Sequence, residues 1–320
     1  MRILETFDEE LIAQLRAQDE FFWLDLIAPS AEEIQRIGTV LGWHPLSIED
    51  TQRMGQRPKL DVYGDGALLV LQAVIAAHPE DENDHPLEEV HCHLTGDYVI
   101  TVHGGRFTDL SQVRTLLQNS TSPKTERYYV YKIIDVIVDS YFPVLSDLDE
   151  EINALEDAIV AGGGRKELQQ TFGLKRLLLT LRRAVVPMRD LFARQVEVIT
   201  DLAGLEADSH DYFRDIYDHL IRITDELDGY HDMVAGCTDL YLSMVANRQG
   251  ETSKQLAIIA SIFLPLSFLT GFFGMNFDWS IAHVLSGPWS FFLLGIGSMV
   301  ISGAIMWWWF RRKGWTGNDE

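Results

Sequence analysis

Cysteine is scarce in this 320-residue chain: Cys92 and Cys237 are the only two, and they stand far apart in unlike surroundings. Two such cysteines favour neither a disulfide framework nor a cysteine-ligated zinc site, so we expect a reducing compartment. The segment after Met1 runs into acidic residues without an apolar stretch, and no secretory signal is visible there. We expect the bulk of the chain in the cytoplasm.

Positive charge is also in deficit. The sequence has 26 Lys and Arg residues against 48 Asp and Glu residues, which leaves a net charge of −22. A field of this sign repels nucleic-acid phosphates and attracts metal cations. We therefore expect divalent cations as partners and no nucleic acid.

The chain also lacks the residue patterns of an enzyme. We find no nucleophile, general base or nucleotide-binding loop at workable spacing. The tract Gly162-Gly163-Gly164-Arg165-Lys166 has no preceding strand pattern and departs from phosphate-loop spacing, so it predicts a turn between helices. We expect neither enzymatic activity nor an organic cofactor.

Two long uncharged stretches stand near the end of the sequence. Neither 256–273 nor 290–310 contains a charged residue, and each is about as long as the roughly 20 residues that cross a bilayer as a helix. A pair of buried core helices is the alternative, but a globular domain rarely needs two such runs close together. We predict transmembrane helices over 254–274 and 289–310, joined by an extracellular loop over 275–288.

Basic residues flank these stretches on one side only, whereas the loop has Asp278 as its single charged residue. Because basic residues stay on the cytoplasmic side, we expect a multi-pass protein of the plasma membrane with both termini in the cytoplasm. Tryptophans at 307–309 precede a basic tail over 311–320, at the level of the lipid headgroups. The basic residues are Arg248, Lys254, Arg311, Arg312 and Lys313.

The part before the spans divides into three predicted segments. Residues 1–122 mix strand-like runs with helical patterns, which predicts a cytoplasmic α/β domain. Residues 123–208 predict long antiparallel helices. Over 209–253 apolar residues follow a heptad seam without proline, so we predict a stalk helix that continues into the first span. Strands are predicted over 22–27, 67–77, 87–94 and 98–103.

Five aspartates recur every seven residues along the predicted stalk, which places their carboxylates on one stripe of the helix. One interpretation is a solvated face opposite the seam. The other requires assembly: around an axis, these carboxylates would form rings or meet neighbouring subunits, and divalent cations would relieve their repulsion. The five are Asp211, Asp218, Asp225, Asp232 and Asp239.

The tripeptide Gly274-Met275-Asn276 stands at the outer end of the first predicted span. It follows a long acidic helix pattern and precedes a short loop, a second span and a basic tail. This arrangement resembles the CorA family of magnesium and divalent-cation channels, whose signature is Gly-Met-Asn, and the similarity covers essentially the whole chain. Tyr212-Phe213-Arg214-Asp215, Tyr241-Leu242-Ser243 and Pro265-Leu266-Ser267-Phe268 also look like family segments.

The first span carries a face of mostly small or hydroxylated residues, which either packs against another helix or lines a pore. The resemblance favours the pore and implies a selectivity filter of Gly274, Met275 and Asn276. Leu256 and Leu264 are then candidate hydrophobic constrictions that gate by dewetting. The implied pore-lining residues are Ser253, Leu256, Ala260, Leu264, Ser267 and Gly271.

A hydrated ion is expected in such a pore. Mg²⁺ gives up its waters reluctantly, and the span offers no carboxylate to replace them. Asn276 amides and Gly274 carbonyls, repeated around an axis, would contact the outer face of the hydrated cation, while Met275 packs. The membrane potential supplies about 4.6 kcal/mol per 100 mV for two charges, so no ATP site is required.

The resemblance also implies regulation and assembly. It implies a homopentamer in which Asp215, with Asp218, takes part in a regulatory intersubunit metal site, so that cytoplasmic Mg²⁺ closes the pore. Asp239 is expected at the cytoplasmic mouth, and Asp278 is left alone to attract cations outside. Many family members carry Met-Pro-Glu-Leu in the loop, whereas Phe277-Asp278-Trp279-Ser280 follows the motif here.

Several functions therefore compete. The leading one is a channel for Mg²⁺, with Co²⁺ or Ni²⁺ as further cargo. A zinc transporter of the same superfamily and a non-conducting membrane-anchored sensor or scaffold are the alternatives.

Glu89, His91 and His93 share one face of a predicted strand, which indicates either a transition-metal site or polar residues on a solvated face.

Overall fold

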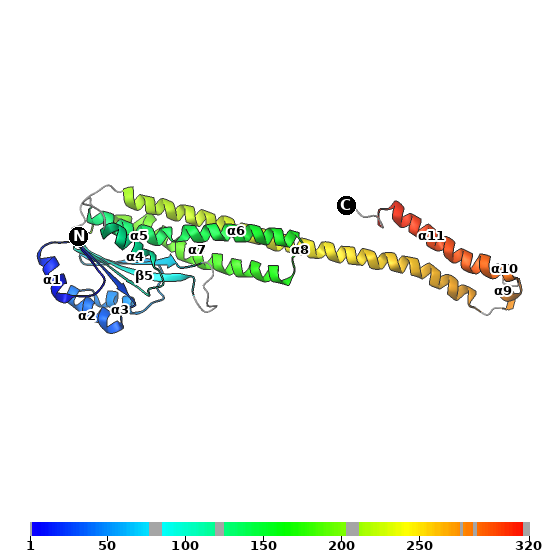
Figure 1. Ribbon diagram of the computed structural model, residues 1–320, viewed down its shortest axis with the longest axis horizontal. Helices are drawn as coiled ribbons and strands as arrows, with labels where there is room; N and C mark the ends of the chain where they lie inside the picture. The colour runs from blue at the N-terminus through cyan, green and yellow to red at the C-terminus, as the bar shows by residue number, and fades with distance from the viewer. Residues whose placement is uncertain are drawn as a thin grey trace. The chain divides into compact units, whose positions relative to one another are not determined.

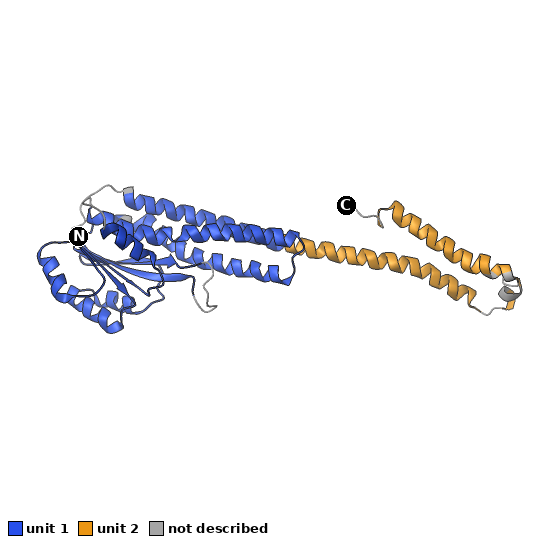
Figure 2. Ribbon diagram, in the orientation of Figure 1, with its two compact units in different colours: residues 1–239 blue, residues 240–320 orange. Residues whose placement is uncertain are grey.

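The computed structural model describes residues 2–76, 85–118, 125–202, 211–275, 278–283 and 287–315 (Figure 1). The chain divides into two compact units, Met1–Asp239 and Leu240–Glu320, which are coloured separately in Figure 2. One helix, α8 (Asp211–Phe273), begins in the first unit and ends in the second.

The first unit is built on a six-stranded mixed sheet with the strand order β1-β2-β6-β5-β4-β3. β1, β2 and β6 run parallel, and the pairs from β6 through to β3 are antiparallel. β6 is buried along its whole length, as expected of a strand covered on both faces. The strands are β1 (Arg2–Leu4), β2 (Phe22–Ile27), β3 (Lys59–Tyr63), β4 (Gly66–Val74), β5 (Leu87–Leu94) and β6 (Tyr98–His103).

Helices cover both faces of the sheet (Figure 1). On one face, α1 (Glu9–Ala17) and α2 (Ala31–Leu41) share an apolar cluster with alternate residues of β2 and β6. α3 (Pro45–Gln52) covers β5 on the same side, where Thr51 contacts His93. On the other face, α4 (Asp109–Gln118) reaches β2 through Arg114.

Three long helices extend the first unit. α5 (Glu126–Asp139) and α6 (Tyr141–Val160) pack on β4, and α7 (Arg165–Thr200) packs on β3 and β4. The glycine tract between α6 and α7 forms the predicted turn, with Gly162 at a φ of 112° that favours glycine. The predicted seam of α8 is buried at Phe213, Ile216, Leu220, Ile223, Leu227, Val234 and Cys237.

The second unit holds the two stretches predicted to cross a membrane. The apolar part of α8 and the segment Phe292–Arg312 are both long and apolar enough to do so. Between them lie the short helices α9 (Asp278–His283) and α10 (Pro288–Ser290). The second stretch starts as a π-helix, η1 (Phe291–Ile296), and continues as α11 (Gly297–Arg312), so Arg311 and Arg312 of the predicted tail are helical.

Candidate cation pathway and carboxylate–histidine cluster

The predicted pore-lining residues form one straight stripe on α8. At about 100° per residue their positions fall within roughly 80° of the helix circumference, and they cover about 27 Å along its axis. That length is close to the roughly 30 Å of a bilayer's hydrocarbon core. The stripe consists of Ser253, Leu256, Ala260, Leu264, Ser267 and Gly271.

All six side-chain positions of this stripe are exposed in the single chain. Leu256 is 63% exposed and Leu264 is 75% exposed, although both are large apolar residues. From Leu240 to Phe273, α8 has no buried residue among those described. Lipid or further copies of the chain must therefore cover this apolar surface, because water would leave it unfavourably hydrated.

α8 ends in a tight turn at the predicted filter. The Gly274 amide donates to the Thr270 carbonyl over 3.0 Å, and the Met275 amide donates to the Phe272 carbonyl over 3.3 Å. A Cβ at Gly274 would lie only 3.0 Å from the Thr270 carbonyl oxygen, so glycine fits this turn best. Met275, which was expected to pack, is 42% exposed, and Asn276 lies outside the described residues.

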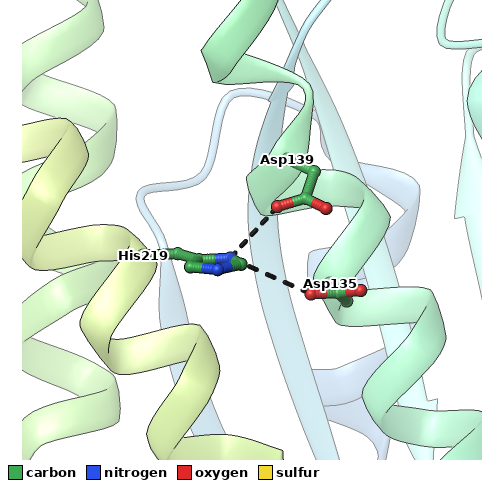
Figure 3. Close-up of side chains that lie close together, drawn as sticks. All are labelled: Asp135, Asp139 and His219. Atoms are coloured by element: carbon green, nitrogen blue, oxygen red, sulfur yellow. Dashed lines mark ion pairs between the residues drawn. The ribbon is translucent and has the colours of Figure 1, made fainter.

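A carboxylate–histidine cluster joins α5 to the start of α8 (Figure 3). His219 Nδ1 lies 3.1 Å from Asp139 Oδ1 and 4.0 Å from Asp135 Oδ1. His219 Nε2 lies 3.8 Å from Asp215 Oδ1, one helical turn earlier on α8. The Tyr131 hydroxyl donates to Asp215 Oδ2 over 3.0 Å and ties that side chain to α5.

Several atoms of this cluster are buried without a hydrogen bond. Asp135 is only 5% exposed, and its Oδ2 accepts from Lys132 over 2.6 Å while its Oδ1 has no hydrogen-bond partner. Asp139 Oδ1 and His219 Nδ1 also lack hydrogen-bond geometry. Burial and the nearby charge of Asp135 raise the pKa of Asp139, despite the opposing effect of His219 and Lys132. A bound cation would compensate these carboxylates.

The donor set of this cluster suits a divalent cation. One ligand atom from each of Asp135, Asp139 and His219 lies within 4.8 Å of the others. Carboxylate oxygens suit Mg²⁺, and an added imidazole nitrogen suits Zn²⁺, Co²⁺ and Ni²⁺. Of the four residues Asp135, Asp139, Asp215 and His219, the sequence predicted only Asp215 as a metal ligand. The missed signal is the pair of four-residue spacings, Asp135 to Asp139 and Asp215 to His219, which each place two ligands on one helix face.

Asp218, predicted to share the regulatory site, stands apart from this cluster and is exposed on α8. Asp225, Asp232 and Asp239 are likewise exposed, so both interpretations of the seven-residue aspartate stripe stay open. The side chain of Asp211 lies outside the described residues. Asp278 begins α9 and is exposed.

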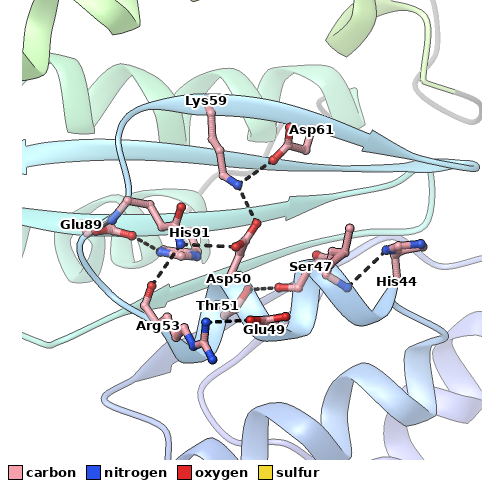
Figure 4. A network of polar contacts seen from close by, with 12 residues as sticks. His44, Ser47, Glu49, Asp50, Thr51, Arg53, Lys59, Asp61, Glu89 and His91 are labelled. Carbon is pink, nitrogen blue, oxygen red and sulfur yellow. Dashed lines mark hydrogen bonds and ion pairs between the residues drawn. The ribbon is translucent and has the colours of Figure 1, made fainter.

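The face of β5 that carries Glu89, His91 and His93 is covered rather than solvated, which corrects one sequence interpretation. Figure 4 shows Glu89 and His91 beside α3 and the turn after it. His91 is fully buried and His93 is 3% exposed. Glu89 Oε2 accepts from the backbone amides of Gly55 and Gln56, at 2.7 Å and 2.8 Å, while its Oε1 contacts His91.

His93 is likewise engaged in packing. Its ring stacks on Trp43 with centroids 3.4 Å apart, and its Nε2 lies 2.9 Å from Thr51 Oγ1. The three polar residues of β5 therefore hold α3 and the turn after it. They do not gather as a metal-binding group in the described part of the chain.

Comparison with known proteins finds relatives that are metal-ion transporters. The sequence profile of the family described as CorA-like Mg²⁺ transporter protein matches residues 18–312. The cobalt/magnesium transport protein CorA of Thermotoga maritima is 32% identical, over 98% of this chain and 89% of that protein. The zinc transport protein ZntB of Photorhabdus laumondii is 29% identical, over 81% of this chain and 77% of that protein.

The fold has solved counterparts as well. The CorA magnesium transporter of Methanocaldococcus jannaschii superposes with a TM-score of 0.78 at 22% identity, covering 92% of this chain and 90% of that one. The likeness extends over the α/β domain, the long helix and the two apolar helices, and it confirms the predicted fold class. The chain belongs to the CorA family of membrane transporters for divalent cations, which are not enzymes.

Proposed function

We propose that this protein is a homopentameric channel that carries Mg²⁺ across the plasma membrane into the cytoplasm. The observation that carries the proposal is the α8 stripe from Ser253 to Gly271. It offers hydroxyl and apolar groups, contains no carboxylate, and is exposed in the single chain. Two spans per chain cannot enclose a pore, so neighbouring copies of α8 supply the other walls.

The chemistry of this stripe favours a hydrated ion. Mg²⁺ keeps its waters where no carboxylate replaces them. At the outer end, Gly274 carbonyls and Asn276 amides contact the water shell, and Asp278 raises the local cation concentration. Asp239 does the same at the cytoplasmic mouth. The membrane potential drives the two charges inward by about 4.6 kcal/mol per 100 mV.

The carboxylate–histidine cluster supports a regulatory cation site. Asp215 and His219 on α8 face Asp139 and the buried Asp135 on α5, so an ion held there fixes α8 to the rest of its unit. Cytoplasmic Mg²⁺ would stabilise the closed pore through this contact, with Asp218 taking part from a neighbouring subunit. Loss of the ion would leave the carboxylates repelling one another and favour opening.

A zinc transporter is the second candidate. Two observations favour it: ZntB proteins are among the relatives, and His219 adds a nitrogen ligand to the cluster. Zn²⁺ binds nitrogen ligands more readily than Mg²⁺ does. Ion selectivity therefore separates the two functions.

The test is ion uptake into proteoliposomes that contain the full-length protein. Mg²⁺, Co²⁺, Ni²⁺ and Zn²⁺ are compared under an inside-negative potential, with and without a proton gradient. We expect Mg²⁺ uptake that follows the potential, needs no proton gradient and is abolished by Asn276→Ala, while Asn153→Ala on α6 leaves it unchanged. Uptake of Zn²⁺ alone, or uptake that requires the proton gradient, would favour the zinc transporter. A non-conducting scaffold predicts no uptake of any ion.

The regulatory site is tested by the Mg²⁺ dependence of the current. Asp215→Ala and Asp139→Asn should shift closure to higher cytoplasmic Mg²⁺, whereas Asp147→Asn, an exposed acid on α6 outside the cluster and the aspartate stripe, should not. Thermal stabilisation of the detergent-solubilised protein by Mg²⁺ should weaken in parallel. An unchanged Mg²⁺ dependence in both cluster variants refutes this regulatory role.

A further inference from the structure

The cytoplasmic end proposed for α11 carries three basic side chains, each lying over a tryptophan one helical turn earlier. A cation above an indole face within about 6 Å of the ring centroid is held by the ring quadrupole. We call these six residues the basic–aromatic collar. The pairs are Arg311 over Trp307 at 5.2 Å, Arg312 over Trp308 at 5.3 Å and Lys313 over Trp309 at 4.9 Å.

The chain beyond the collar is fixed by a helix cap. The Gly314 amide donates to the Arg311 carbonyl over 3.2 Å, and the Trp315 amide donates to the Phe310 carbonyl over 2.9 Å. Gly314 adopts a φ of 70°, and the Trp315 ring stacks on the fully buried Phe310 with centroids 5.7 Å apart. This is the Schellman motif with its apolar contact, and it satisfies two terminal carbonyls of the helix without using the basic side chains.

The collar surrounds the helix end rather than marking one face. Successive residues are about 100° apart, so the three pairs cover more than half of the circumference. The tryptophan residues remain 53%, 56% and 42% exposed at positions 307, 308 and 309. No acidic residue occurs in 287–315, so the three positive charges have no carboxylate partner within that segment.

Charge and shape together indicate the occupant. The chain as a whole has a net charge of −22, whereas the collar is positively charged and adjoins an apolar helix. Guanidinium groups bind phosphate oxygens through paired N–H donors, and indole rings favour the boundary between headgroups and acyl chains. A ligand that joins a negatively charged phosphate to acyl chains matches both features.

We propose that the basic–aromatic collar binds the headgroups of anionic phospholipids. The tryptophan faces hold Arg311, Arg312 and Lys313 at headgroup depth, where their N–H groups contact the phosphodiester, while the rings contact the glycerol and upper acyl chains. A zwitterionic lipid fits less well, because its own ammonium group offsets the phosphate charge. This inference does not depend on which ion the protein transports.

The test is tryptophan quenching by brominated lipids in vesicles that contain the full-length protein. Trp279 and Trp289 are replaced by Phe, so that membrane-level fluorescence comes from the collar and Trp315. Brominated phosphatidylglycerol or brominated phosphatidylcholine is added at the same small fraction to phosphatidylcholine vesicles. We expect stronger quenching by the phosphatidylglycerol, and we expect added salt to reduce the difference.

Charge removal supplies the decisive comparison. R311Q/R312Q/K313Q should weaken the preference for phosphatidylglycerol by about a hundredfold, since each basic residue at an anionic surface contributes about fivefold. The matched variant R165Q/K166Q/K175Q removes three exposed charges from α7 and should keep the preference. Trp308→Leu should give an intermediate ratio, because Arg312 loses the ring beneath it.

Four results would overturn the proposal, three of them as a whole and the fourth for the tryptophan rings alone. Equal quenching by both lipids would show that the collar does not select anionic headgroups. A preference that survives R311Q/R312Q/K313Q would place the selecting residues elsewhere, for example on a neighbouring copy. Equal losses in the collar and α7 variants would show that only the overall charge matters. An unchanged ratio in Trp308→Leu would refute the part assigned to the rings.

Discussion

At the scale of single residues, the most unusual group in the α/β domain is His103 at the end of β6. It is 2% exposed and lies between two buried carboxylates, with Nε2 3.2 Å from Asp25 Oδ1 and Nδ1 3.5 Å from Glu88 Oε1. Burial alone would lower the pKa of His103, but the hydrogen bonds and charges of Asp25 and Glu88 raise it to about 9. Arg114 lies 3.4 Å from Asp25 and compensates its negative charge. The protonated His103 ring then compensates the charge of Glu88.

This raised pKa predicts a pH-dependent stability. The contribution is fully present below the unfolded-state value of about 6.5 and is lost as the pH rises through about 9, with a total on the order of 3 kcal/mol. The melting temperature of the full-length protein in detergent should therefore fall between neutral pH and pH about 9.5. His103→Gln should lower stability at neutral pH and flatten this fall, whereas His231→Gln, at an exposed site, should leave it intact. A His103→Gln profile as steep as the wild type contradicts the assignment.

Glu89 is the second residue whose substitution should reveal its structural role. Its carboxylate accepts the backbone amides of the exposed Gly55 and the half-buried Gln56 and contacts the fully buried His91, so Glu89→Gln puts a donor in place of one acceptor oxygen and leaves part of this set poorly paired. We expect a loss of about 2 kcal/mol, measured by chemical unfolding of the full-length protein. Glu32→Gln, an exposed acid on α2, serves as the control. Equal effects of the two substitutions would mean that the Glu89 contacts contribute little.

At the scale of elements, the spacing of apolar residues predicted those helices, strands and turns that depend on local sequence alone. The α8 seam, the turn at Gly162 and strands β2, β5 and β6 follow from apolar spacing and glycine. The coverage of β5 by α3 did not follow, because that short helix carries no strong periodic signal. The carboxylate–histidine cluster was missed for a related reason: Asp139 and His219 meet only when α5 packs beside α8, which sequence spacing does not reveal.

The α8 stripe predicts opposite outcomes for two leucines on the same helix. Leu264 lies on the stripe, and Leu269 lies on the far side of α8, about 140° away. Leu264→Ala should widen an apolar constriction and raise Mg²⁺ uptake severalfold at high cytoplasmic Mg²⁺, because a wider passage is more easily wetted. Leu269→Ala should leave closure unchanged. The measurement is proteoliposome uptake with Mg²⁺ inside, and equal leakage in both variants would argue against a constriction at Leu264.

At the scale of the whole molecule, a single chain does not bury all of its own apolar surface. One chain exposes the whole apolar length of α8 beyond Leu240, including a stripe with no partner in the described part of the chain. A homopentamer would bury that surface, and native mass spectrometry of the detergent-solubilised protein should give five chains. A monomer or dimer as the smallest active species would leave the stripe unable to enclose a passage.

If the α8 stripe lines a water-filled passage for a hydrated cation, then a water-soluble reagent must reach its side chains from the passage. In a Cys92→Ala/Cys237→Ala background, Ser267→Cys and Leu269→Cys are each treated with a positively charged, water-soluble thiol reagent during Mg²⁺ uptake into proteoliposomes. We expect modification of Ser267→Cys to block uptake while Leu269→Cys stays active. Block at Leu269→Cys with full uptake through modified Ser267→Cys would contradict it.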